Sequence, residues 1–170
     1  TIVRFGPEIT QLVRSGGADL GIHTHFYLDE SLDATPLGVS SIIPVASPRH
    51  PLANGHPIVP ADLADMRISL TGPWTYTRRL VDNWFAERGV ALCHVMEVSS
   101  HEEIRMAALK NMTIGFVGRA AVRDDVAAGR LKILDIRDFE LSRPVYVSHR
   151  KGIQGSARWL LDFLVKCSDL

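Results

Sequence analysis

The amino-acid sequence predicts an α/β fold, in which strands and helices alternate along the chain. The segment 95–117 shows this most clearly, because two short apolar runs, Val95–Val98 and Ile114–Val117, flank a helical pattern with Ile104 and Ala108 on one face. Two strands joined by a helix form a right-handed parallel unit. The composition agrees, since 46% of the 170 residues are hydrophobic and 22% are charged, as in a globular protein with a buried core. We therefore expect an α/β protein with largely parallel sheets.

Glycine and proline mark most boundaries of the predicted elements. Pro7 suits the first turn of a helix that begins at Gly6, and Gly16 with Gly17 ends it, because glycine accepts the left-handed conformation of a helix stop. A dense Pro, Gly and Asn composition predicts a loop at 47–57. The other elements, in order, are strands at 1–5 and 18–22, a strand within 35–46, a helical turn at 60–63, a strand at 66–70, a helix at 77–88, a helix at 119–128, strands at 131–136 and 144–149, and a helix at 156–166.

Composition and charge exclude several classes of protein. Lysine and arginine number 19, and aspartate and glutamate also number 19, so the chain lacks the basic excess of a nucleic-acid-binding domain. Cys93 and Cys167 lie far apart without metal-binding spacing, and we expect them to be reduced. The sequence has no apolar run that could span a membrane and does not begin with a signal peptide. These observations predict a cytoplasmic protein without a membrane partner.

The sequence offers little for catalysis or metal binding. His23 and His25 would share one face of a strand, and Asp29 and Glu30 follow, but no third ligand has a recognised spacing. A nucleophile elbow, a paired Cys/His signature and a phosphate-binding glycine motif are all missing from the sequence. We therefore assign no catalytic residue, no metal site and no cofactor.

Six segments, taken in order, resemble the effector-binding domain of LysR-type transcriptional regulators. They are GGADLGI, SPRHPLA with PADLAD, WTYTRRLVDNWFAERGV, VSSHEEIRMAAL with IGFVGRAAV, AAGRLKIL, and PVYVSHRKG before WLLDFL. No single segment is specific, but their order over nearly the whole chain is. The segments TRRLVDNWFAERG and VSSHEEIRMAAL are most similar to the branch that includes regulators of carbon fixation and sulfur metabolism.

This resemblance implies a periplasmic-binding-protein-like fold of type 2, with two α/β subdomains around an interdomain cleft. One subdomain would comprise residues 1–44 and 145–170, and the other residues 45–144. The segments Ile43–Ser47 and Pro144–Ser148 would be the crossovers and hence the hinge. The implied function is to bind a small metabolite in the cleft and so control DNA binding and transcription. A solute-binding protein of a transporter, or an enzyme on the same fold, is the alternative.

The sequence also departs from the family. The winged helix-turn-helix, its linker helix, and the first strand and helix of the effector domain are not among these residues, so we expect an N-terminally truncated domain that reaches DNA only through a part absent from this chain. The turn KNMTIGF stands where the family has a glycine pair, and Asn111 can adopt the left-handed conformation there. The family further implies a homodimer or higher homo-oligomer, for which the helices Glu8–Ser15 and Thr77–Arg88 are the candidate contacts.

Hydroxyl groups collect where predicted strands end and helices begin. Thr71, Thr75 and Thr77 precede or open one helix, and Ser99 and Ser100 precede the next. Helix N-termini favour negative charge, so converging ends with hydroxyl donors suit an anionic effector. The alternative is that each hydroxyl caps its own helix. With the resemblance, the predicted ligand-binding residues are Gly6, Thr24, His25, Thr71, Thr75, Tyr76, Thr77, Ser99, Ser100, Gly115 and Phe116.

Two further side chains near these hydroxyls allow more than one role. Arg78 would either add a charged donor or point to solvent. Trp74, like Phe116, would line the apolar part of a pocket or be buried in the core.

Overall fold

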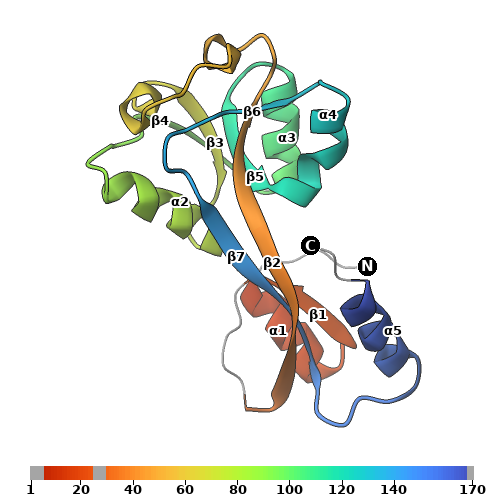
Figure 1. Cartoon of the computed structure of the whole chain (residues 1–170). Coiled ribbons are helices and arrows are strands. Elements are labelled where there is room, and N and C mark those ends of the chain that lie inside the picture. The colour runs from red at the N-terminus through yellow and green to blue at the C-terminus, as the bar shows by residue number, and fades with distance from the viewer. Residues whose placement is uncertain (1–5, 25–29, 168–170) are drawn as a thin grey trace. The chain divides into compact units, whose positions relative to one another are not determined.

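The structure is a computed structural model that describes residues 6–24 and 30–167. The chain divides into two compact units, Thr1–Ser40 with Arg143–Leu170 (unit 1) and Ser41–Ser142 (unit 2). Figure 1 labels their helices and strands. The strand expected at 1–5 lies outside the described residues, as does His25.

Unit 2 is built on a sheet whose inner strands are parallel. Strand β3 (Arg67–Thr71) pairs in parallel with both β4 (His94–Val98) and β5 (Ile114–Gly118), with Ile68 beside Val95 on one side and Ile114 on the other. Strand β2 (Leu32–Ala46) runs antiparallel to β5, and β6 (Lys132–Ile133) runs antiparallel to β2. With β1 (Leu20–His23) and β7 (Leu141–Arg150) included, the strand order is β1-β7-β2-β5-β3-β4, and β6 pairs with β2.

The expectation of largely parallel sheets is therefore wrong. Alternating strands and helices determine only that strands joined by a crossover helix run parallel. They do not determine the direction of β2, which enters unit 2 from unit 1 and pairs with β5 through Ile42–Val45. The sheet is mixed for this reason.

Both faces of the inner strands of unit 2 are covered by helices (Figure 1). Ile114 and Phe116 of β5 face helix α2 (Tyr76–Ala86), where Phe116 meets Phe85 edge to face at 5.8 Å between ring centroids. Val117 faces the other side, in a cluster with Ile104 of helix α3 (His101–Leu109). Side chains of a strand point alternately to its two faces, so one short strand contributes to both clusters.

Several predicted boundaries change in the structure. The helix expected at 119–128 is a 3₁₀ turn, Arg119–Val122, followed by α4 (Arg123–Ala127). The strand expected at 131–136 keeps only the two residues of β6, because Leu134 N donates to the carbonyl of Pro44 and Ile136 then bridges to Ile58. The helical turn Pro60–Leu63 is confirmed, and the loop at 47–57 contains a second 3₁₀ turn, Pro51–Ala53.

Unit 1 places two helices on the antiparallel pair β1–β7, in which Leu20 lies opposite His149. A small core joins Leu161 to Val145 and Val147. The predicted stop of the first helix is confirmed, since α1 ends at Ser15 and Gly16 has a φ of +82°. The elements of unit 1 are α1 (Gly6–Ser15), β1 (Leu20–His23), the first part of β2, β7 (Leu141–Arg150) and α5 (Gly155–Lys166).

A buried carboxylate joins α3 to α4. The Asp125 side chain is only 5% exposed and accepts from Arg105 Nη1 at 2.6 Å and from Arg130 Nε at 2.7 Å. Arg105 also holds Glu102 on its own helix. The hydrogen bond from Arg105, together with that from Arg130, lowers the pKa of Asp125 below its ordinary value, against the opposing effect of its burial. The ion pairs therefore stabilise the folded state most when this carboxyl is ionised.

Substitution Asp125→Ala should lower the free energy of unfolding by about 1–3 kcal/mol at neutral pH, because two charge-assisted hydrogen bonds are lost. Since the folded pKa is depressed, this contribution is present above the ordinary carboxyl pKa of about 3.9 and is lost as pH falls through the lower folded value. Urea unfolding at pH 7 and near pH 3 measures both effects. Asp124→Ala, at an 89% exposed neighbour, is the control and should change little. An equal loss for Asp125→Ala at both pH values would contradict the prediction.

Candidate functional site

The candidate site lies at the edge of the unit 2 sheet where β3 and β4 end. These strands are parallel and place Thr71 beside Val98. Each strand then turns into a helix, α2 after β3 and α3 after β4. The N-termini of both helices therefore lie at the same sheet edge, as the sequence predicts, and present their backbone N–H groups there.

The hydroxyl groups of Thr71 and Thr75 form a hydrogen-bonded network with the backbone at the start of α2. Thr75 Oγ1 donates to the carbonyl of Gly72 at 2.9 Å and accepts from Arg78 N at 3.3 Å. Its 2.6 Å partner is Thr71 Oγ1, which then supplies the proton of that bond because the single Thr75 proton is already used. Thr71 is 4% exposed and Thr77 is 3% exposed. Of these three predicted ligand residues, Thr75 is therefore the one that a solvent-borne ligand can reach.

A carboxylate of the chain itself closes the start of α3. Glu103 N donates to Ser100 Oγ at 3.2 Å, and Ser100 Oγ donates to Glu103 Oε1 at 3.0 Å. Ser99 N donates to Glu103 Oε2 at 3.1 Å. Glu103 thus folds back over the helix end in a variant of the capping box. The capping role anticipated for the serines is confirmed for Ser100, as it is for Thr75 on α2.

Arg78 is neither a free donor nor a solvent-facing side chain. Its Nε lies 2.8 and 2.9 Å from the two carboxylate oxygens of Asp82, and its Nη1 donates to the carbonyl of Thr71 at 3.3 Å. Glu97 lies 3.9 Å away, and the Arg78 side chain is 15% exposed. Arg78 therefore braces the end of β3, and its charge is balanced by neighbouring carboxylates.

Two of the predicted ligand residues belong to the core instead. Phe116 has no exposed surface and packs against Phe85 and Phe139. Its side chain has no face left for a ligand, because strand β5 is buried on both sides. Gly115 is also buried, and a Cβ there would lie 2.4 Å from Ile104 Cγ2. The absence of a side chain at Gly115 is explained by the close approach of α3 to β5.

Aromatic side chains border the entry to α2. Trp74 is 56% exposed, and its ring covers Gly72 so closely that a Cβ on Gly72 would meet it at 2.3 Å. Tyr76 is half-buried, with the guanidinium of Arg79 5.7 Å from its ring centroid. Exposed Trp74 and half-buried Tyr76 thus supply apolar surface beside the reachable hydroxyl of Thr75.

Unit 1 contains the remaining predicted ligand residues. Gly6 begins α1, and Thr24 follows β1 and is half-buried. Sequence reasoning considered His23 only as a metal ligand and missed its burial, with Nε2 2.6 Å from Ser148 Oγ and the ring almost fully buried. Burial lowers the pKa of His23 below its ordinary value. The spacing of His23 and His25 drew attention to His23, but only the tertiary pairing of β1 with β7 explains its burial.

Within residues 6–24 and 30–167, no group of three or more His, Cys, Asp and Glu side chains is arranged to hold a metal ion. Cys93 and Cys167 are exposed and free. The part of the chain that the structure describes also contains no helix with the length and hydropathy of a membrane span.

Comparison with known proteins gives this arrangement a family. The model of the LysR substrate binding domain matches residues 2–167, almost the whole chain. The chain belongs to the LysR substrate binding domain family. This is the effector-binding domain of LysR-type regulators, as the six sequence segments predict.

Several curated relatives of this LysR domain are transcriptional regulators. A RuBisCO operon transcriptional regulator of Acidithiobacillus ferrooxidans is 32% identical over 117 residues, which cover 69% of this chain and 38% of the relative. The HTH-type transcriptional regulator CysL of Bacillus subtilis is 24% identical over 142 residues, covering 84% of this chain and 48% of CysL. The chain thus spans less than half the length of these relatives.

Solved structures support the type 2 periplasmic-binding-protein-like fold of the LysR domain. The regulatory domain of CcmR from Synechocystis PCC6803, solved in complex with 2-PG, matches with a TM-score of 0.78 and 27% identity, covering 95% of this chain and 79% of that one. The effector binding domain of QuiR, in complex with shikimate, has a TM-score of 0.76 and 20% identity, covering 94% and 76%. The likeness to QuiR shows the fold alone.

The close approach at Gly115 generates a stability prediction. Gly115→Ala should lower the free energy of unfolding by about 1–3 kcal/mol, because the added methyl group overpacks the contact between β5 and α3. Denaturant unfolding of the single variant measures this. In an Ile104→Ala background the same substitution should cost much less, since the clashing Cγ2 is gone and the two effects are coupled. Additive losses in the double variant would show that the Gly115–Ile104 contact is not the cause.

Proposed function

We propose that this chain senses a small anionic metabolite and thereby regulates the DNA binding of the protein to which it belongs. The regulator names of the relatives support the second part, and the geometry of unit 2 supports the first. The proposal assigns no catalytic step to the chain. One curated relative, the phosphonates import ATP-binding protein PhnC of Anaeromyxobacter dehalogenans, is 28% identical over 152 residues and favours the transporter alternative, but transcriptional regulators predominate among the relatives.

One observation carries the anionic character of the effector. The Glu103 carboxylate binds the Ser99 N–H and the Ser100 hydroxyl at the end of α3. A carboxylate of the chain therefore already uses the donors that the sequence analysis assigned to an effector. A helix N-terminus stabilises such a group through its partial positive charge and its unpaired N–H donors. A ligand carboxylate or phosphate would exchange with Glu103 at these donors.

The solved relatives provide the probes for this site. Their structures hold 2-PG, shikimate or benzoate, and the last two are carboxylates. In this chain, the accessible hydroxyls are those of Thr75, Ser99 and Ser100 of unit 2, with Trp74 and Tyr76 as the apolar border. Thr75 and Ser100 would exchange their present acceptors, the Gly72 carbonyl and the Glu103 carboxylate, for the ligand. We propose that Gly6, Thr24 and His25 of unit 1 complete the site in an interdomain cleft, with Ile43–Ser47 and Pro144–Ser148 as the hinge.

Effector binding controls the protein only if it changes a conformational equilibrium. A ligand shifts such an equilibrium by its difference in affinity for the two states. The proposed contacts of one ligand with residues of both units would give it such a difference in affinity between two arrangements of the units. We propose that DNA contact belongs to a part of the protein outside this chain. We also propose that the regulator is cytoplasmic, as expected of a protein that binds promoters.

Loss of a single accessible hydroxyl should weaken effector binding without unfolding the domain. Ser100→Ala and Thr75→Ala should each weaken binding by about one to two decades, because a hydrogen bond to a charged group contributes roughly 1.5–3 kcal/mol. Calorimetry with 2-PG, shikimate and benzoate measures the affinity. Thr75→Ser retains the hydroxyl and should retain most of the binding. If both alanine variants bind as tightly as the parent chain, these hydroxyls are caps only, and the effector site lies elsewhere.

Neutralising Glu103 should have the opposite effect. In Glu103→Gln the side chain no longer presents a charged competitor for the Ser99 N–H, so an anionic ligand should bind about three- to tenfold more tightly. Glu102→Gln is the matched control, because Glu102 is held by Arg105 on the flank of α3 and contacts neither serine. Unchanged or weaker anion binding by Glu103→Gln would contradict the exchange. The melting temperatures of both variants measure the loss of stability from the weakened Glu103 cap, independently of ligand binding.

We also propose that the chain forms a homodimer, with α1 and α2 as candidate contacts. A two-fold contact is self-complementary, so each helix would meet the other helix of the partner. Sedimentation velocity from low to high micromolar concentration should show a concentration-dependent dimer, and α2 substitutions at exposed Arg79 should weaken it. A monomer throughout this range would contradict the pairing.

A further inference from the structure

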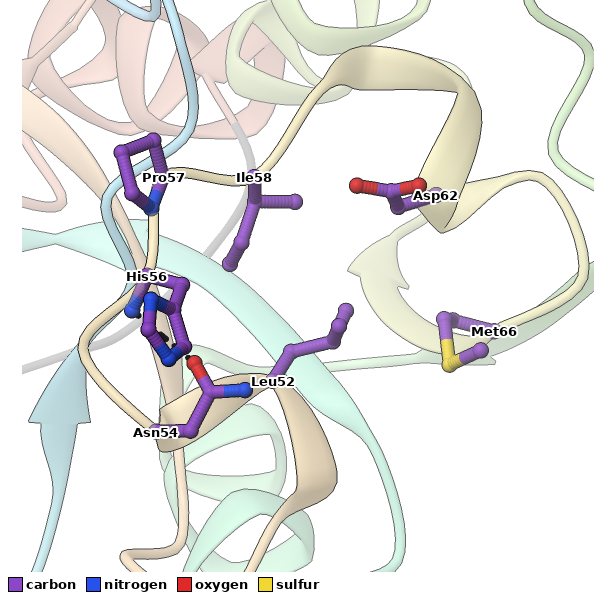
Figure 2. Close-up of a pocket in the computed structure, with 7 residues that line it drawn as sticks. All are labelled: Leu52, Asn54, His56, Pro57, Ile58, Asp62 and Met66. Atoms are coloured by element: carbon purple, nitrogen blue, oxygen red, sulfur yellow. Dashed lines mark hydrogen bonds between the residues drawn. The ribbon is translucent and has the colours of Figure 1, made fainter.

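Unit 2 contains a second concave site, at the opposite end of β3 from the candidate effector site. It is a pocket of about 370 Å³, lined by residues of the segment 52–62 and by Met66 (Figure 2). Met66 immediately precedes β3, whereas Thr71 ends it. Five residues of strand rise roughly 16 Å, so the pocket and the effector site are separate.

The floor of this pocket is apolar and is formed by residues at the periphery of the hydrophobic core. Ile58 is 2% exposed and is part of the main hydrophobic cluster of unit 2, and Leu52 and Met66 pack against that cluster. Figure 2 shows Leu52 and Ile58 between the two polar sides of the pocket. An apolar group of a ligand would cover the exposed parts of the half-buried Leu52 and Met66 side chains, which is favourable.

Polar groups lie on both sides of this floor. His56 and Asn54 form one side, and the Asp62 carboxylate lies on the other (Figure 2). Asp62 Oδ2 accepts from Val59 N at 3.0 Å, and no hydrogen bond to Oδ1 is present among the described residues. Asn54 Oδ1 accepts from His56 N at 2.9 Å, which leaves the Asn54 amide protons directed elsewhere. Asp62 is the one acidic side chain among the pocket-lining residues.

The segment that forms the pocket is held in place although it contains no long element. Ile58 N donates to Asp135 O at 2.8 Å, and Arg137 N donates to Ile58 O at 2.8 Å. His50 Nδ1 accepts from Leu52 N at 3.2 Å and fixes the start of the first 3₁₀ turn. The pocket is therefore preformed, which reduces the entropy lost when a ligand binds.

We propose that this pocket binds a small amphipathic amine. Its apolar part would cover Leu52 and Met66 beside the buried Ile58, and its ammonium group would donate to Asp62 Oδ1. The volume lies at the small end of the range for ligand pockets, which suits a single aromatic ring or a short aliphatic chain. An acid of the same shape would meet the Asp62 carboxylate and bind less well. The proposal is independent of the effector site.

Methyl and amide NMR spectra of the whole chain test this with three probes of one shape, phenethylamine, 2-phenylethanol and phenylacetate. We expect phenethylamine to shift the methyl signals of Leu52, Ile58 and Met66. It should bind about three- to fivefold more tightly than 2-phenylethanol, since an exposed ion pair adds only a modest preference. Phenylacetate should bind most weakly.

Asp62→Asn separates the charge from the fold, because the asparagine oxygen can still accept from Val59 N. This variant should lose the preference for the amine over the alcohol, while Asp65→Asn, at an exposed aspartate outside the pocket lining, should retain it. Three outcomes would overturn the proposal. They are unshifted floor methyls at millimolar phenethylamine, shifts centred on Thr75 and Ser100 instead, and an amine preference that survives in Asp62→Asn.

Discussion

The structure of unit 2 depends on burying both faces of its inner strands. Strand β5 is buried along its whole length, and β3 along all but its first residue. Two faces need two layers, and α2 and α3 provide them from the crossovers that join β3 to β4 and β4 to β5. Polar side chains inside this arrangement pair with one another, as Thr113 donates to Ser69 at 2.9 Å, because an unpaired buried hydroxyl is costly. Gly115 follows from the same constraint, since α3 approaches β5 too closely for a Cβ.

The candidate site is a by-product of this layering. Helices that return across a parallel sheet begin at the carboxyl edge of the strands, so the N-termini of α2 and α3 meet there. Side chains of the chain itself cap the N–H groups at these helix starts, Thr75 on α2 and Ser100 with Glu103 on α3. A ligand at this edge competes with internal acceptors, the Gly72 carbonyl and the Glu103 carboxylate, and its affinity depends on the free energy needed to displace them. Arg78 is also paired within the chain, because its ion pair with Asp82 offsets the positive charge that would attract an anion.

Unit 1 is stabilised in a different way. Its core of Leu37, Val145, Val147 and Leu161 is small, and specific polar contacts supplement it. Arg150 donates to the carbonyls of Val13 at 2.7 Å and Ala18 at 3.0 Å, which satisfies backbone acceptors around the end of α1. Helix α5 keeps Trp159 and Phe163 stacked on its outer side, with Trp159 67% exposed. The two units thus differ in how much of their apolar surface they cover themselves.

The sequence by itself determined the local features. Hydrophobic period, glycine stops and hydroxyl caps located α1, α2, α3 and β3 to β5, because each signal acts within a few residues of the chain. The left-handed Asn111, with φ of 58°, belongs to this class. The order of six family-like segments also identified the LysR fold, since a pattern spread over the whole chain does not depend on any one boundary. The division of the chain at 44 and 145 stays a prediction about subdomains and their hinge.

Only the tertiary structure decided the long-range features. The antiparallel direction of β2, the shortening of β6 and the burial of His23 beside Ser148 result from partners at least seventy residues away. The availability of each candidate ligand residue was decided in the same way. Sequence patterns place Thr71 at the end of a strand, Thr77 at the start of a helix and Phe116 within a strand, but their exposure depends on what packs against them. The contacts of Glu103 with both serines likewise depend on the folded turn.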